Sequence, residues 1–274
     1  MRTLAARAAA TDGVGPLNEE AGFALRDDSS VHLLYPEVTN TSAVTGYLQW
    51  QSGYRTAQLV VDPEHRRSGI GTHLLAALGD RPSLGVWAFT DLPAAQSFAK
   101  AVGLVPSRSL LIMERSLTGI TRPGLPAGLT LRGYTDADAG DLLAVNAAAF
   151  AHHPEQGALD AAGLAARVAE PWFDPAGLIL GFDDEGLAGF HWTKRVDADT
   201  GEVYVMAVAP RVQGRGYGRV LLQAGLAHLH ETATGRVLLY VDSAEAVAVR
   251  MYESAGFTVT RRDVLYAPKD QEQP

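Results

Sequence analysis

Two glycine-rich turns are the segments of this sequence best suited to binding a charged ligand. Residues 213–218 (QGRGYG) and residues 66–71 (RRSGIG) each follow a short apolar run and precede an amphipathic stretch with leucines at helical spacing. Glycines in such a turn allow consecutive backbone N–H groups to point the same way, and the following helix adds the positive end of its dipole. Each turn is therefore predicted to bind a pyrophosphate group. The alternative is a turn that only reverses the chain.

The two turns do not match the phosphate-binding motifs of common nucleotide-binding folds. Neither contains the Walker A pattern G-x-x-x-x-G-K-(S/T). The dinucleotide pattern G-x-G-x-x-G fails from Gly214, because Arg219 stands where its third glycine would be. Both turns share the pattern (Q/R)-x-x-G-x-G instead.

The elements around the turns form a repeat at a spacing of about 150 residues. Aligned without gaps, Gly69 falls on Gly216 and Gly71 on Gly218. In each copy a buried-strand candidate follows (84–89 and 237–242), and then an Ala-rich helical stretch with a glycine near its end (94–104 and 246–257). The repeat predicts a duplicated α/β unit. The Pro/Gly-rich segment between the copies predicts three parts: an N-terminal domain (1–117), a linker (118–127) and a C-terminal domain (128–274).

Hydrophobic periodicity predicts the remaining elements. They are a helix near 2–11 and strands near 31–36 and 43–50 in the first copy, then a strand near 128–133, a helix over 136–150 capped by Thr135 or Asp136, and strands near 177–182, 187–194 and 202–208 in the second.

Composition limits the class of protein. The chain has 274 residues, of which 47% are hydrophobic and 20% charged, with a formal net charge of -8. These values exclude a largely disordered chain and argue against nucleic-acid or membrane binding as the main role. The absence of cysteine excludes a disulfide scaffold and a cysteine nucleophile and fits a cytoplasmic protein. Neither a signal peptide nor a run of about 18 apolar residues is found. The histidine pairs 152–153 and 228/230 lack the spacing of a metal site, so no metal is expected.

Two turns in register, each followed by the same strand and helix, resemble the GNAT N-acetyltransferase superfamily. The resemblance implies two tandem α/β domains, each with a mixed, mostly antiparallel central sheet flanked by helices, and acetyl-CoA as co-substrate. It assigns acetyl-CoA to the end of a strand, the turn and the last helix of a copy. In the second copy these positions are Met206, Ala207, Val208, Gln213, Gly214, Arg215, Gly216, Tyr217, Gly218, Arg219, Glu245, Ala246, Val247, Ala248, Val249 and Arg250. In the first copy they are Leu59, Val60, Val61, Arg67, Ser68, Gly69, Ile70, Gly71 and Thr72, with Arg66 as added charge.

One departure from the superfamily pattern precedes the last helix. Ala244 and Glu245 stand where Asp-Asn is expected, so a side-chain contact to CoA is lost while backbone contacts from 245–250 remain available.

Acetyl transfer to an amine requires a base for the ammonium and an acid for the departing thiolate. Glu202 begins the strand that leads to the second turn, and Tyr252 lies four residues before Gly256, where the superfamily has its thiolate-protonating tyrosine. The first copy has Arg55 and Ala99 at these positions. The C-terminal copy is therefore predicted to be catalytic and the N-terminal copy non-catalytic, with its turn still able to retain acetyl-CoA.

Stretches outside the general motif sharpen the resemblance. DGVGPLNE (12–19), HHPEQG (152–157), PWFDPAGLIL (171–180) and GFHWTK (189–194) are similar to tandem enzymes that acetylate the cysteinyl amine of Cys-GlcN-Ins in mycothiol formation. The resemblance implies these substrate-binding residues: Glu19, Glu155, Lys194, Glu202 and Tyr240. A monomer is expected. The alternatives are a tandem enzyme for another small amine, such as an aminoglycoside, and a non-catalytic acyl-CoA sensor.

Overall fold

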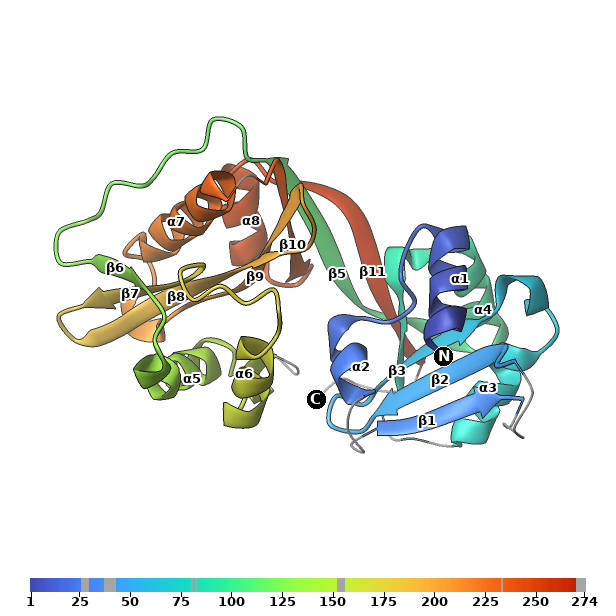
Figure 1. Ribbon diagram of the computed structural model, residues 1–274. Coiled ribbons are helices and arrows are strands. Elements are labelled where there is room, and N and C mark those ends of the chain that lie inside the picture. Colours follow the sequence, from blue (N-terminus) through green and yellow to red (C-terminus); the bar gives the residue numbers. More distant parts are fainter. Residues whose placement is uncertain are drawn as a thin grey trace. The chain divides into compact units, whose positions relative to one another are not determined.

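A computed structural model describes residues 1–25, 30–36, 43–79, 81, 83–151, 156–232 and 234–269. The chain divides into two compact units. Unit 1 comprises residues 1–111, 242–244 and the described part of 261–274, and unit 2 comprises 112–241 and 245–260. Both units combine a sheet with helices, as the α/β class requires (Figure 1).

The sheet of unit 1 contains both antiparallel and parallel pairs. Its strand order is β1 (Ser30–Tyr35), β2 (Gly46–Gln51), β3 (Thr56–Val61), β4 (Gly85–Ala88) and β11 (Thr258–Pro268). β3 pairs with β4 in parallel, whereas the other neighbours are antiparallel. The helices are α1 (Arg2–Asp12), α2 (Glu19–Ala24), α3 (Ile70–Leu78) and α4 (Pro93–Ala101), with short 3₁₀ helices at Pro63–His65 and Phe89–Asp91. The main core of the unit joins Ile70 and Leu74 of α3 to Leu48, Val86 and Tyr266 of the sheet.

Unit 2 repeats this arrangement with longer strands. Its order is β5 (Leu104–Ser116), β10 (Arg236–Asp242), β9 (Thr200–Val208), β8 (Gly186–Arg195), β7 (Leu178–Asp183) and β6 (Thr130–Gly133). β9 and β10 are parallel, and β6 to β9 are antiparallel. The helices are α5 (Ala139–Ala149), α6 (Ala161–Val168), α7 (Tyr217–Glu231) and α8 (Ala246–Ser254), with 3₁₀ turns at Asp136–Asp138, Gln156–Ala158 and Pro210–Val212.

Two strands are divided between the units. β5 begins in unit 1, and its residues from Ile112 onward belong to unit 2. β11 follows α8, yet its residues from Arg261 onward belong to unit 1, where Val264 and Tyr266 lie opposite Ala88 and Val86 of β4. The compact units therefore do not coincide with the domains predicted on either side of the 118–127 linker, because each unit includes residues from both sides of it.

Local signals explain where several elements begin and end. The Thr135 hydroxyl and backbone N–H both donate to the Asp138 carboxylate, at 2.8 and 2.9 Å, so Thr135 caps the 3₁₀ turn Asp136–Asp138. The predicted 136–150 helix is thus a capped 3₁₀ turn that leads directly into α5. α4 ends before Gly103, whose φ of 78° is left-handed. No helix in the described part of the chain is long and apolar enough to cross a membrane.

Candidate active site

The two glycine-rich turns have the same backbone conformation. Gly214 and Gly216 have φ values of 80° and 83°, and the matching Arg67 and Gly69 have 64° and 84°. A residue with a Cβ rarely adopts this left-handed region, at a cost of about 1–2 kcal/mol. Arg67 therefore holds a conformation that glycine would adopt more easily. Gly69 and Gly216 also cap the N-termini of α3 and α7, where a phosphate site requires free N–H groups.

In unit 2 the end of β9, the start of α7 and helix α8 approach one another. A Cβ placed on Gly218 would lie 3.4 Å from Cγ2 of Val208 and 3.6 Å from Sδ of Met251. These three residues come from α7, β9 and α8. Val208 and Gly218, two of the positions predicted for acetyl-CoA, thus lie close together.

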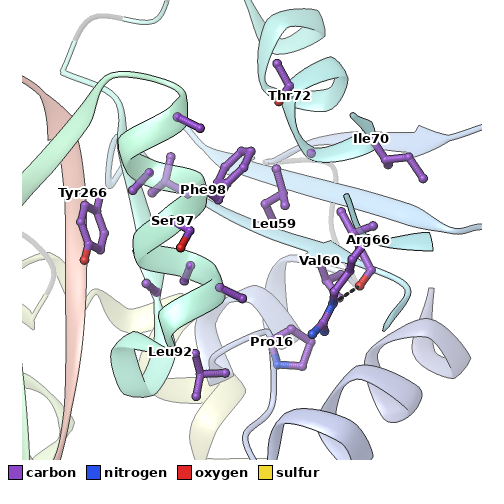
Figure 2. Close-up of a pocket in the computed structure, with 18 of the residues that line it drawn as sticks. Pro16, Leu59, Val60, Arg66, Ile70, Thr72, Leu92, Ser97, Phe98 and Tyr266 are labelled. Carbon is purple, nitrogen blue, oxygen red and sulfur yellow. Dashed lines mark hydrogen bonds between the residues drawn. The ribbon is translucent and has the colours of Figure 1, made fainter. Parts of the chain in front are cut away.

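Unit 1 contains a cavity of about 650 Å³ at the equivalent place (Figure 2). Its lining includes the end of β3, the turn, the start of α3 and much of α4. Among the positions predicted for acetyl-CoA in this copy, Leu59, Val60, Val61, Arg67, Gly69, Ile70, Gly71 and Thr72 line the cavity. Ser68 does not, and its hydroxyl donates to the carbonyl of His65. The cavity lies in the copy that has Arg55 and Ala99 in place of the proton-transfer residues.

Arg66 has a structural partner. Its guanidinium donates to both carboxylate oxygens of Asp12, at 2.8 and 2.7 Å, and this bond raises the pKa of the arginine. Asp12 is the last residue of α1, so the pair attaches α1 to the turn. The expectation that Arg66 adds charge toward a phosphate is therefore weakened, because Asp12 neutralises it.

Three residues predicted for the acceptor share one face of the unit 2 sheet. Lys194 lies directly opposite Glu202 across β8 and β9. Leu238 of β10 also lies beside Glu202, and Tyr240, two residues further on, points to the same side. Tyr240 is 49% exposed. A carboxylate, an ammonium and a phenol are thus presented together.

A β-bulge lies next to this group. Trp192 is opposite Val205 but Thr193 is opposite Val203, so Tyr204 is the extra residue of the bulge on β9. Such an extra residue re-aims a side chain, and bulges are frequent at active sites. Tyr204 packs edge-on against Trp172 with 4.9 Å between ring centroids, and its hydroxyl accepts from Nε of Arg167 at 2.9 Å.

The aromatic rings beside the bulge hold Lys194. Its Nζ lies 4.6 Å from the ring centroid of Trp172 and 5.0 Å from that of Tyr204, which is a cation–π geometry. Trp172, Tyr204 and Arg167 were not predicted from the sequence. Two of them could have been found, because Trp172 belongs to the PWFDP stretch and Tyr204 lies in the strand that carries Glu202.

Tyr252 lies on α8, next to the Met251 that approaches the turn. Burial raises the pKa of its phenol to about 12. The ring packs edge-on against Phe257, with 5.7 Å between the ring centroids. The phenol therefore keeps its proton at neutral pH.

The other predicted residues have separate positions. Glu19 is the first residue of α2 in unit 1, following the cap residue Asn18. Glu155 lies outside the described residues. His191 is completely buried, with Nδ1 2.9 Å from the carbonyl of Leu221, and Trp192 belongs to the core of unit 2. No cluster of three or more potential metal ligands occurs among the residues that the structure describes.

Comparison with solved structures supports the same class. A tandem GNAT protein from the clavulanic acid biosynthesis pathway has a TM-score of 0.72 at 21% identity, covering 99% of this chain and 94% of its own. A GCN5-related N-acetyltransferase from Sphaerobacter thermophilus has a TM-score of 0.70 at 21% identity, covering 97% and 90%. The family model "Acetyltransferase (GNAT) family" matches residues 149–257. The fold is therefore that of the tandem GNAT class.

Sequence relatives narrow the assignment. A mycothiol acetyltransferase from Propionibacterium freudenreichii is 44% identical over 264 residues, covering 94% of this chain and 84% of the relative. One from Rhodococcus opacus is 42% identical over 281 residues, covering 96% and 92%. The chain belongs to the mycothiol acetyltransferase family.

Proposed function

We propose that this protein transfers the acetyl group of acetyl-CoA to the cysteinyl amine of Cys-GlcN-Ins, giving mycothiol, and that unit 2 performs the reaction. The observation that carries the proposal is the grouping of Glu202, Lys194 and Tyr240 on one sheet face beside the bulge at Tyr204. Relatives that are 41–45% identical and named mycothiol acetyltransferase support the choice of acceptor.

The reaction needs three proton transfers and one exchange of bonds. Glu202 takes one proton from the substrate ammonium, directly or through water, and passes it to solvent. The free amine attacks the thioester carbon, the C–S bond breaks, and the nitrogen gives its second proton to Glu202 as the neutral amide forms. Tyr252 donates its proton to the departing CoA thiolate and regains one from solvent. The pantetheine arm lies along Met206, Ala207 and Val208, and the turn at 213–218 with Arg219 holds the pyrophosphate through backbone N–H groups.

The acceptor is rich in hydroxyls, so its site needs carboxylates, an ammonium and phenols as hydrogen-bond partners. Lys194 is held in a defined position by Trp172 and Tyr204, which suits it to orient a polar substrate. Tyr240 and Glu202 add partners on the same face. Glu155 joins this set through the family resemblance, and the same resemblance is the ground for the substrate-binding role of Glu19 of unit 1.

The cavity of unit 1 has a different proposed role. It keeps the turn and the strand end that bind acetyl-CoA, while Arg55 and Ala99 replace the proton-transfer groups. Binding of a pyrophosphate by backbone N–H groups does not need those groups. The first copy therefore holds a second acetyl-CoA without turning it over.

The decisive experiment supplies acetyl-CoA with Cys-GlcN-Ins or with a panel of other amines, including an aminoglycoside and a peptide N-terminus. Release of the CoA thiol is followed, and the product mass is measured. Preferred turnover of Cys-GlcN-Ins supports the proposal. Faster acetylation of another amine would overturn the choice of acceptor, and the absence of any acetylated product would leave a sensor.

A further inference from the structure

A strained turn precedes α4 in unit 1. Thr90 and Asp91 have φ values of 60° and 44°, two successive non-glycine residues in the left-handed region. For a β-branched residue such as Thr90 this conformation is a steric outlier. The turn joins β4 to the start of α4, where Leu92, Ala94 and Ala95 line the cavity. The conformation of the turn thus sets the position of one cavity wall.

Strand β11 fixes this turn at two points. The backbone N–H of Thr90 donates to Oδ1 of Asp263 at 2.7 Å, and the hydroxyl of Tyr266 donates to Oδ1 of Asp91 at 2.7 Å. Asp263 and Tyr266 are both buried. A disfavoured backbone conformation persists only where its surroundings determine it, and these two bonds do so.

Tyr266 also lines the cavity itself, on β11 beside α4 (Figure 2). It lies opposite Val86 of β4, another lining residue. Burial and the neighbouring Asp91 raise the pKa of Tyr266 to about 12, so the phenol stays neutral and keeps donating to the carboxylate.

We infer that Tyr266 is a ligand-contact residue of the unit 1 cleft, and that Asp263 and Tyr266 together position the α4 wall of that cleft for an acyl-CoA. The binding site of the first repeat is thereby completed by the last strand of the second. The inference rests on the proposed occupancy of unit 1 by acetyl-CoA and adds residues that the glycine-turn pattern does not contain.

The test is calorimetric titration of the full-length protein with acetyl-CoA. The parent is expected to bind two molecules per chain. Tyr266→Phe keeps the ring but removes the hydrogen bond to a charged group, so affinity at one site is expected to fall about tenfold while the other is unchanged.

Tyr47→Phe is the matched control. Tyr47 belongs to the same unit, is 1% exposed, and places its hydroxyl 2.7 Å from Nδ1 of His32, but it is not part of the cavity lining. Tyr47→Phe also loses one buried hydroxyl. Because this hydroxyl is remote from the cavity lining, both acetyl-CoA affinities are expected to stay at the parent values.

Two substitutions at Asp263 separate positioning from packing. Asp263→Asn retains an oxygen that accepts from Thr90 N–H and is expected to keep both affinities. Asp263→Leu removes the acceptor and is expected to weaken the same site as Tyr266→Phe.

The outcomes distinguish the two ideas. A parent that binds a single acetyl-CoA overturns the occupancy of unit 1, and the role of Tyr266 with it. A parent that binds two, with unchanged affinities in Tyr266→Phe or an equal loss in Tyr47→Phe, overturns the role of Tyr266 and leaves the occupancy intact.

Discussion

Individual side chains of unit 2 divide between those that react and those that hold them. Glu202 and Tyr252 supply the proposed proton transfers, whereas Trp172 and Tyr204 keep Lys194 in place. The buried His191 belongs to neither group, because its Nδ1 is 2.9 Å from a helix carbonyl and its ring lies against α7. Two predictions follow at this scale.

Glu202→Gln is expected to lower the acetylation rate about 10²–10⁴-fold at neutral pH, the range typical of a lost general base. The loss should shrink at high pH, because the solution then supplies free amine. Rates with Cys-GlcN-Ins across a pH series measure this. Glu185→Gln, at an exposed carboxylate, is the control and should match the parent. A few-fold loss independent of pH would remove Glu202 from the role of base.

His191 is expected to make stability depend on pH. Burial lowers its pKa from 6.5 to about 4, so the folded protein keeps the ring neutral. Below pH 6.5 the unfolded chain binds the proton first, and stability is lost as the pH falls toward 4, by about 3 kcal/mol for this shift. The contribution is fully present above pH 6.5.

Urea unfolding at pH 7.5, 6 and 5 measures this dependence. His191→Gln, which cannot titrate, should flatten the part of the curve between pH 6.5 and 4. His230→Gln removes an exposed histidine and should retain the parent slope. Parallel curves for the parent and His191→Gln would contradict the assignment.

At the scale of elements, the glycine turns join strand, phosphate site and helix. Gly216 caps α7 at φ 83°, so any side chain there is strained and also lies at the proposed phosphate site. A substitution at this turn therefore requires a control variant in which another positive-φ glycine of the same unit, away from the turn, is replaced.

Gly216→Val is expected to raise KM for acetyl-CoA at unit 2, because the side chain blocks access to the backbone N–H groups. Gly186→Val is the control, since Gly186 has φ 115°, open space around it and a position at the start of β8, directly after the turn from β7. Both variants should lose similar stability in thermal unfolding without ligand. Equal KM values for acetyl-CoA in the two variants would count against the phosphate site.

The sequence predicted the elements that local chemistry determines. The α/β class, both glycine turns and the cap at Thr135 were identified, because turn residues and helical periodicity act over a few positions. The division of β5 and β11 between the two units was missed, since the pairing of a strand depends on residues far away in the chain. The bulge at Tyr204 and the strained turn at Thr90 were missed for the same reason.

At the scale of the whole molecule, the stability of unit 1 depends on residues at the other end of the chain. Val264 and Tyr266 are 4% and 7% exposed and belong to the main core of unit 1. Losing one large buried side chain typically costs about 3–5 kcal/mol. Such a cost falls on unit 1, although the residues follow unit 2 in sequence.

Removal of residues 262–274 is therefore expected to open unit 1 first. Limited proteolysis should cut within 1–111 while 120–260 stays protected, because Thr260 still donates to the carbonyl of Ile112 in unit 2. Removal of 270–274 alone keeps every described contact of β11 and should leave the parent pattern. Early cuts confined to unit 2 would contradict this assignment.

The division of β5 and β11 between the units has a consequence for the gene. After an ordinary duplication, either half can be deleted without harm to the other. Here each half encodes strand residues that belong to the other unit, so deleting either half removes part of a sheet from what remains. The N-terminal half, which has Arg55 and Ala99, is thus required for the folding of the C-terminal half, whether or not the N-terminal half binds a ligand.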